Sequence, residues 1–262
     1  MRKILKNISW RAWRVWQRHF DVYKATWKVN FIPPVLEPLL YLVAFGVGLG
    51  SMVKDVPYGG KMLTYLQFLA PGLAATAVMN HGFFETTYSS FVRMYYQRTW
   101  AAMLSTPLML EDVILGEIVW GATKSFFAGA IMLSIACVWG LIPLRAALIM
   151  LPVTFLAGMT FSGLGICFTA VVRDIEMFNF PVFLFVTPMF LFSGVFFPIQ
   201  SLPPWAQYTA HLLPLTFLVS VMRGITFGDF GWLQTAELLA LLVIAAVTVY
   251  LGMVLMKKRL LK

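Results

Sequence analysis

Six long apolar runs constrain the fold of this chain more than any other feature of its sequence. Each has at least the roughly 20 residues that a helix needs to cross a bilayer. The runs are 31–53, 63–88, 113–140, 146–170, 177–197 and 232–256. Hydrophobic residues make up 60% of the chain and charged residues 12%, whereas soluble domains contain about 25% charged residues. Because a soluble fold cannot bury that much apolar surface, the sequence predicts an integral membrane protein.

The predicted fold is an all-α membrane protein with six transmembrane helices in one domain, residues 1–262. The first apolar run begins only at Phe31, after a charged stretch, and no small-residue cleavage site follows it. We therefore expect no removable signal peptide. Cys137 and Cys167 both lie in apolar runs, which favours buried thiols over a disulfide or a metal site.

The distribution of basic residues predicts the orientation of the spans. With the N-terminus in the cytoplasm, fifteen Lys and Arg residues fall on the cytoplasmic side and four on the outer side. This asymmetry indicates that both ends of the chain are cytoplasmic. The net charge of +9 is concentrated at the chain ends, beside apolar runs, which favours an anionic membrane surface over nucleic acid as its partner.

Residues 7–28 are predicted to form an amphipathic helix before the first span. Aromatic residues recur at helical spacing along one side, namely Trp10, Trp13, Trp16, Phe20, Tyr23 and Trp27. Arginines gather on another face, namely Arg11, Arg14 and Arg18. Such a helix is expected to lie in the cytoplasmic membrane interface. The alternative is an ordinary soluble amphipathic helix.

Four polar side chains within the spans are candidate functional groups, namely His81, Glu85, Glu117 and Lys124. Asn80-His81 and Glu85 are one helical turn apart in the second span, and Glu117 and Lys124 are two turns apart in the third. Charged groups in spans usually face a bundle interior or an aqueous cavity. For Glu117, near the predicted cytoplasmic end, a solvated or packing role is an equally good interpretation.

The stretch 198–231 is too long for a tight turn and too apolar for a solvated loop. Pro203-Pro204 and Pro214 start two short helical pieces, 203–210 and 214–226, and Gly228 ends the second. Neither piece is long enough to span. The sequence therefore predicts a re-entrant helical hairpin, 203–226, in the outer leaflet before the last span.

The stretch 93–112 interrupts two apolar runs with a polar, amphipathic segment. An apolar stripe is formed at helical spacing by Trp100, Met103, Leu104 and Leu108. Thr106-Pro107 reads as an N-cap followed by proline at the first position of the next helix. Because an apolar stripe on a cytoplasmic helix needs a partner, this segment is predicted to be a docking element.

No motif for ATP hydrolysis, metal-dependent hydrolysis or nucleophilic catalysis occurs in the sequence. The energy for any work must then come from a partner or a gradient. A gradient-driven transporter favours paired acids near the bilayer centre, but Glu85, Glu117 and Glu237 lie near span ends. A lipid-modifying enzyme has only His81 with Glu85 as a candidate pair, for which a structural role is the simpler interpretation.

Several segments resemble one family of transporters. They are "LEPLLYLVAFGVGLG" (36–50), "FLAPGLAATAVMN" (68–80), "FFETTYSSFVRMYYQRTWAAMLSTPL" (83–108), "EDVILGEIVWGATKS" (111–125) and "LFSGVFFPIQSLPPW" (191–205). In this order they resemble the membrane (permease) subunit of a type-2 ABC exporter. Within this ABC-2 permease family they are most similar to the nodulation-factor exporter group. The segment from Phe83 to Ser125 is the most specific.

The resemblance implies a cytoplasmic coupling helix, 97–107, that docks into a cleft of an ATPase subunit. The residues assigned to docking are Arg98, Thr99, Trp100, Met103, Leu104 and Pro107. The implied assembly contains two copies of this chain and two ATP-binding cassette subunits, which bind ATP and Mg²⁺. This chain itself is expected to have no catalytic residue, metal or cofactor.

The resemblance also implies export of an amphiphile, such as a lipo-oligosaccharide or a lipid-linked saccharide, across the bacterial inner membrane. The alternative within the family is efflux of hydrophobic drugs. The residues assigned to the substrate pathway between two permease copies are Tyr88, Phe91, Phe183 and Phe190.

Overall fold

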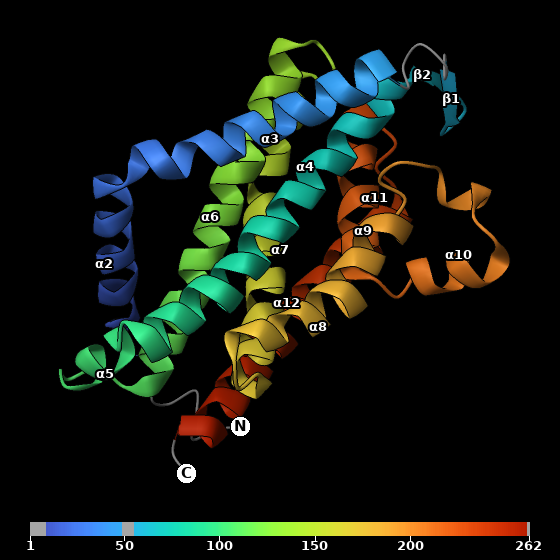
Figure 1. Cartoon of the computed structure of the whole chain (residues 1–262). Coiled ribbons are helices and arrows are strands. Elements are labelled where there is room, and N and C mark those ends of the chain that lie inside the picture. The colour runs from blue at the N-terminus through green and yellow to red at the C-terminus, as the bar shows by residue number, and fades with distance from the viewer. Residues whose placement is uncertain (1–8, 49–54, 261–262) are drawn as a thin grey trace.

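A computed structural model describes residues 9–48 and 55–260, and its regular structure is almost entirely helical (Figure 1). The α-helices are α2 (Ala12–Ala25), α3 (Trp27–Gly48), α4 (Tyr65–Phe84), α5 (Thr99–Leu104), α6 (Leu110–Val138), α7 (Leu144–Val171), α8 (Asn179–Pro181), α9 (Thr187–Phe192), α10 (Pro204–Ala210), α11 (Pro214–Phe227) and α12 (Trp232–Leu260). The 3₁₀ and π turns are η1 (Glu85–Ser89), η2 (Val92–Tyr96), η3 (Ile175–Phe178), η4 (Val182–Val186) and η5 (Ile199–Ser201). Residues 7–8 of the predicted first helix and 49–53 of the first predicted span lie outside the described residues.

Five helical segments of the described chain are long and apolar enough to cross a membrane. They are Trp27–Gly46 of α3, α6, α7, the run Ile175–Phe192, and α12. They coincide with five of the six predicted spans and confirm an all-α membrane protein.

The predicted second span, 63–88, has a different character. Its helix α4 is not among the five apolar segments, since Gln67, Asn80 and His81 lower its hydropathy. Most of α4 is nevertheless buried, and the helix packs against α6 and α7. A helix covered by its neighbours exposes little surface to lipid, so it tolerates more polar residues. Its crossing of the membrane stays a prediction.

Helix α7 is the centre of the bundle and contacts α4, α6, α11 and α12. Two glycines of α7 permit close approaches to these neighbours. A Cβ atom on Gly158 would lie 2.9 Å from the Cα of Ala122 in α6, and one on Gly163 would lie 2.5 Å from Oγ1 of Thr248 in α12. Small residues that let backbones approach closely are typical of helix packing in membranes.

The second feature of the packing is a series of hydroxyl groups that bond to backbone carbonyls of α4. Ser125 donates to the carbonyl of Val78 at 2.8 Å, and Ser162 donates to that of Gly82 at 3.3 Å. These bonds fix α6 and α7 against α4 without charged groups, because a buried hydroxyl needs a partner.

A short β-hairpin was not predicted. Strands β1 (Asp55–Tyr58) and β2 (Lys61–Thr64) pair antiparallel, joined by Gly59-Gly60 with φ of +56° and +72°. Positive φ at both central residues is the geometry of a two-residue hairpin turn, which favours glycine. Lys61 donates to the carbonyl of Phe227 at 2.6 Å, so the hairpin packs on the end of α11. The Gly59-Gly60 pair was the sequence feature from which this hairpin turn could have been predicted.

The predicted re-entrant hairpin corresponds to two helices, α10 and α11, which meet at an angle of 84°. Their bounds agree closely with the predicted pieces 203–210 and 214–226. In Figure 1 they lie at the end of the bundle away from α5. The re-entrant arrangement of this pair in the outer leaflet stays a prediction.

Replacement of Gly158 by valine tests the close contact of α6 and α7. Because backbone atoms of Ala122 occupy the space, we expect overpacking to cost about 1–3 kcal/mol and to lower the thermal unfolding temperature of the purified protein. Leu148→Val on the exposed face of α7, where the side chain is 58% exposed, is the control and should unfold near the wild-type temperature. Equal unfolding temperatures for Gly158→Val and wild type would contradict this packing.

Candidate functional site

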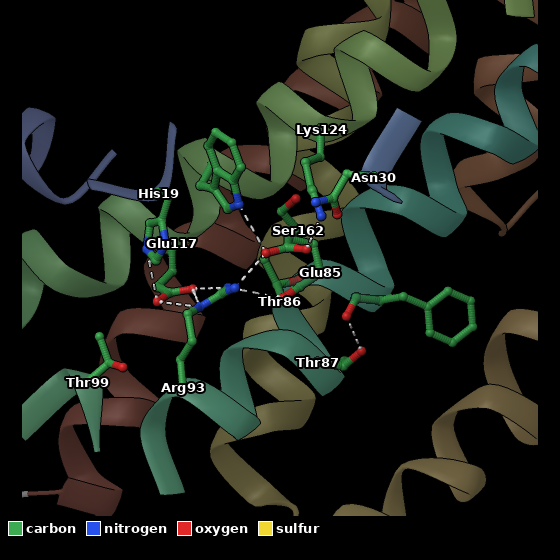
Figure 2. Close-up of polar contacts among 12 residues, drawn as sticks. His19, Asn30, Glu85, Thr86, Thr87, Arg93, Thr99, Glu117, Lys124 and Ser162 are labelled. Atoms are coloured by element: carbon green, nitrogen blue, oxygen red, sulfur yellow. Dashed lines mark hydrogen bonds and ion pairs between the residues drawn. The ribbon is translucent and has the colours of Figure 1, made fainter. Parts of the chain in front are cut away.

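A cluster of charged side chains lies inside the protein where α2, the end of α4, α5 and α6 meet (Figure 2). Arg93 lies between two carboxylates. Its Nε is 3.1 Å from both oxygens of Glu117, its Nη2 is 2.5 Å from Oε2 of Glu117, and its Nη1 is 2.7 Å from Oε1 of Glu85. The guanidinium therefore joins α6 to the end of α4 through charge-assisted hydrogen bonds.

Four further side chains complete this charge cluster. Lys124 donates to Oε2 of Glu85 at 2.9 Å, and His19 Nε2 lies 3.2 Å from Oε1 of Glu117. Two indoles also donate to the carboxylates. Trp120 donates to Glu85 and Trp100 donates to Glu117, each at 3.0 Å. We call His19, Glu85, Arg93, Trp100, Glu117, Trp120 and Lys124 the charge cluster.

Burial makes each of these bonds necessary. The side chain of Glu117 is 0% exposed and that of Glu85 is 5% exposed. An ionised carboxylate removed from water is costly unless it is paired and hydrogen-bonded. Burial by itself lowers the pKa of the Arg93 guanidinium, but Glu117 and then Glu85 outweigh burial and raise that pKa above its ordinary value. Arg93 thus keeps its charge.

Two π turns present Glu85 and Arg93 on one side of the chain. Glu85 opens η1 and Arg93 lies in η2. Such turns disturb the regular backbone bonding of an α-helix and occur frequently at functional sites. Thr86 donates to the carbonyl of Gly82 at 2.8 Å, and Thr169 of α7 donates to the carbonyl of Thr86 at 2.8 Å. Side-chain hydroxyls thus supply partners near the irregular turn.

Helix α5 has one face inside the protein and one outside. Thr99, Trp100 and Met103 are buried, whereas Leu104 is 39% exposed. The residue that precedes the helix, Arg98, has a φ of +51°. A left-handed conformation costs about 1–2 kcal/mol for a residue with a side chain, and such strain is often found at functional sites.

Residues near both ends of the chain are tied to the start of α6. The backbone N–H of Ser9 donates to Asp112 at 2.7 Å, and Lys257 pairs with Glu111 at 2.6 Å. The start of α2 and the end of α12 therefore lie at the same end of the bundle as α5 (Figure 1). We call this the α5 end.

The predicted N-cap at Thr106-Pro107 is wrong. Helix α6 begins at Leu110 with Met109 as its N-cap residue. The side chain of Asp112 accepts a hydrogen bond from the Met109 N–H at 3.2 Å, whereas the Thr106 hydroxyl donates to the carbonyl of Met103. An acidic side chain in the first turn thus caps the helix from within.

Two adjoining cavities open beside the charge cluster, with volumes of about 390 and 380 Å³. Both are lined by Glu85, Tyr88, Ser89 and Lys124. The first extends along α2, and the second reaches Glu37 of α3. The lining combines charged, hydroxyl and aromatic side chains, so it can bind a group with both polar and apolar parts.

The residues predicted to dock an ATPase divide between the two faces of α5. Arg98, Leu104 and Pro107 are exposed, whereas Thr99, Trp100 and Met103 are buried. The docking role itself stays a prediction. The hydrogen bond from Trp100 to Glu117 shows that the side chain of Trp100 points into the protein.

The residues predicted for the substrate pathway do not form one group. Tyr88 lines both cavities, and its ring is 5.0 Å from that of Phe178. Phe91 is buried against the same ring at 5.4 Å. Phe183 is 67% exposed, and Phe190 contacts Phe196. Their pathway role also stays a prediction.

The polar residues predicted within the spans are mostly brought together. Glu85, Glu117 and Lys124 belong to the charge cluster, and His81 lines the second cavity with Glu85. Nδ1 of His81 lies 3.1 Å from the carbonyl of Ala77. The interpretation of Glu117 as a solvated group is wrong, because the residue is fully buried.

Sequence reasoning missed Arg93, His19 and Trp120 as members of this cluster. Arg93 follows Glu85 by eight residues, about two helical turns, and this spacing was the available signal. His19 falls outside the aromatic stripe predicted for 7–28 and lies one turn after Val15, the other buried residue of α2. No local signal identified Trp120.

The fold and the site define the class of the protein. It is an all-α, multi-pass membrane protein with a short peripheral helix attached to buried charges at one end. Such an arrangement suits a transport subunit that responds to another protein.

Comparison with known proteins gives the family. Residues 11–227 match the model of the ABC-2 type transporter family. Nodulation protein J of Rhizobium leguminosarum bv. trifolii is 37% identical over 256 residues, which cover 98% of this chain and 95% of the relative. Nodulation protein J of Rhizobium meliloti is 35% identical, covering 96% and 95%. The inner membrane transport permease YadH of Escherichia coli is 26% identical, covering 87% and 86%. The chain belongs to the ABC-2 type transporter family.

Membership of this family has two direct consequences. The chain is the transport component of an ABC transporter, embedded in a membrane. Membrane subunits of this family are normally paired with a separate ATP-binding protein, so an ATP-binding cassette partner is implied.

A double-mutant cycle tests the charge cluster. Arg93→Met leaves Glu117 buried without its main cation, so we expect a loss of about 3–5 kcal/mol in stability. In Arg93→Met/Glu117→Met both charges are gone, and much of that loss should be recovered. Thermal or denaturant unfolding of the purified protein measures both effects. Additive losses, with no coupling between the two positions, would contradict a direct buried pair.

Proposed function

We propose that this chain is the permease subunit of an ATP-driven exporter that moves an amphiphile out of the bacterial inner membrane. In the proposed complex two copies of the chain face each other and two ATP-binding cassette subunits supply ATP and Mg²⁺ sites. The α5 end lies in the cytoplasm, in agreement with the excess of Lys and Arg at both chain ends.

The hydrogen bond from Trp100 to Glu117 carries this proposal. Helix α5 presents Arg98 and Leu104 outward, where an ATPase subunit can bind, and its buried indole reaches the charge cluster. Glu117 is bonded to Arg93, and Arg93 to Glu85. A displacement of α5 is thereby transmitted to α6 and to the end of α4 through rigid, desolvated bonds.

The two cavities beside the cluster support an amphiphilic substrate. Their walls hold Glu85 and Lys124 together with the ring of Tyr88. The similarity to relatives named nodulation protein J favours a lipid-linked saccharide or lipo-oligosaccharide. In the proposed mechanism ATP binding moves α5, and spans α3, α4 and α8–α9 separate to admit the substrate from the inner leaflet.

A gradient-driven mechanism finds less support in the described residues. Glu37 and Glu85 are the acids that line the cavities. Glu85 is held in ion pairs with Arg93 and Lys124, and Glu117 of the charge cluster is paired with Arg93. A proton relay needs an acid that gains and loses its proton during transport, and close cations oppose protonation.

Purification of the tagged chain from its native membrane in mild detergent tests the assembly. We expect an ATP-binding cassette protein to co-purify at one copy per permease. Leu104→Asp places a charge on the exposed face of α5, so we expect several-fold less ATPase to co-purify. Leu260→Asp changes an exposed leucine at the same end of the bundle and should leave the amount unchanged. A wild-type chain that purifies alone from membranes where it is active would overturn the proposal.

Trp100→Phe tests transmission separately from docking. The substitution removes the indole N–H but keeps an aromatic ring, and a hydrogen bond to a charged group contributes about 1.5–3 kcal/mol. We expect normal co-purification and ATP hydrolysis, with transport per ATP hydrolysed reduced about tenfold.

Trp139→Phe, which changes an exposed tryptophan just after α6, is the control for this substitution. It should transport as the wild type does. Unchanged coupling in Trp100→Phe would discard the role of the Trp100–Glu117 bond.

A further inference from the structure

A polar cavity of about 180 Å³ lies far from the charge cluster, beneath the hairpin of α10 and α11. We call it the hairpin cavity. Its walls come from β1, the segment after α9, and helices α10, α11 and α12. Its lining includes Tyr58, Ser193, Gln207, Thr216, Arg223 and Glu237. The volume far exceeds the roughly 10–15 Å³ that one water molecule requires.

Three polar atoms in this lining have no hydrogen-bond partner among the described residues. They are Oγ of Ser193, Oγ1 of Thr216 and Oε2 of Glu237. The three residues are only 0%, 1% and 8% exposed. Each unsatisfied buried group costs about 1–3 kcal/mol, and buried polar groups are usually satisfied. Their convergence on one cavity indicates that its contents supply the missing partners.

Arg223 adds a fixed donor to the same cavity. Its Nε donates to the carbonyl of Phe68 at 3.2 Å and its Nη2 to that of Val195 at 3.0 Å. The guanidinium carbon also lies 3.7 Å from the centre of the Phe68 ring. These contacts hold the group in place, and a guanidinium has five N–H donors, so the two bonds leave capacity for a ligand.

The chemistry of the lining defines the class of ligand. One guanidinium, one carboxyl group and the imidazole of His211 face the cavity, together with three glutamine amides, from Gln200, Gln207 and Gln234. Donors and acceptors are therefore mixed, without an excess of either charge. A hydroxyl-rich, uncharged group satisfies such a lining, because each hydroxyl both donates and accepts.

We propose that the hairpin cavity binds the saccharide head of an amphiphile, one sugar ring at a time. A sugar ring has a volume comparable with that of the cavity and offers hydroxyls to Ser193, Thr216 and Glu237. The statement that this ligand is the transported substrate rests on the proposed function. The cavity thereby becomes a saccharide site at the end of the bundle opposite α5, formed jointly by the hairpin and α12.

Direct binding to the full-length protein in lipid nanodiscs, without any ATPase subunit, tests the site. The probes are an alkyl β-glucoside with a fluorophore at the end of its chain, and the same labelled chain ending in a simple alcohol. We expect the wild type to bind the glucoside about tenfold more tightly than the alcohol, since a site built for hydroxyl groups discriminates against ligands that lack them. Equal affinities would overturn the proposal.

A pair of matched threonine substitutions locates the binding. Thr216→Val removes a hydroxyl from the cavity, so we expect the dissociation constant of the glucoside to rise about three- to tenfold, with that of the alcohol unchanged. Thr209→Val changes an exposed threonine of α10 outside the cavity and should bind as the wild type does. An unchanged glucoside affinity in Thr216→Val would overturn the proposal.

A photoreactive alkyl glucoside provides a test that requires no variant. In the wild type, peptides within 193–237 should be labelled, and excess unlabelled glucoside should suppress the labelling. Labelling confined to other parts of the chain would overturn the site. Since these assays contain no ATPase subunit, their failure leaves the co-purification result intact. Absence of an ATPase partner would in turn leave a positive binding result standing.

Discussion

The burial of two carboxylates, Glu85 and Glu117, is the constraint on which the α5 end of this structure depends. A carboxylate that is removed from water needs cations and hydrogen-bond donors nearby. Arg93 satisfies both acids at once, and Lys124 satisfies the second side of Glu85. The chain must then continue beyond Glu85 to Arg93 in a course that lets the guanidinium reach both acids. This stretch contains the two π turns, η1 and η2.

The same constraint fixes the two peripheral helices. Helix α2 contributes His19 and α5 contributes Trp100, and both reach Glu117. Val15 of α2 and Met103 of α5 also pack into one apolar cluster with α6, so the polar bonds act together with apolar packing to determine where the two helices lie. An external force on α5 therefore acts on the buried ion pairs and through them on α6. In the proposed function, this is the physical basis for coupling ATP hydrolysis on a partner to movement within the membrane.

The opposite end of the bundle uses polar groups differently. At the α5 end Arg93 and Lys124 satisfy the two acids. Beneath α10 and α11, by contrast, Ser193, Thr216 and Glu237 leave atoms without partners around a cavity. Satisfied polar groups make a rigid joint, whereas unsatisfied ones create a place for a ligand. The proposed coupling element and the proposed saccharide site thus lie at opposite ends of the bundle.

Predictions from the sequence succeeded where a property is local. Apolar runs gave five spans, and prolines gave the bounds of α10 and α11. The candidates Glu85, Glu117 and Lys124 were identified because a charge within an apolar run stands out. The docking interpretation of α5 was less complete, since helical spacing shows that Trp100 lies on an apolar stripe but not that the stripe faces Glu117.

The sequence by itself determined a multi-pass helical membrane protein, its family resemblance and the polar residues within its spans. Only the tertiary structure decided which of these residues meet. His19 and Glu117 are far apart in the chain, and so are Phe68 and Arg223, yet each pair is in contact. Such pairs depend on how helices pack, for example on the close approach that Gly116 of α6 allows to Val15 of α2. The spacing of residues along one helix carries no information about the helix opposite.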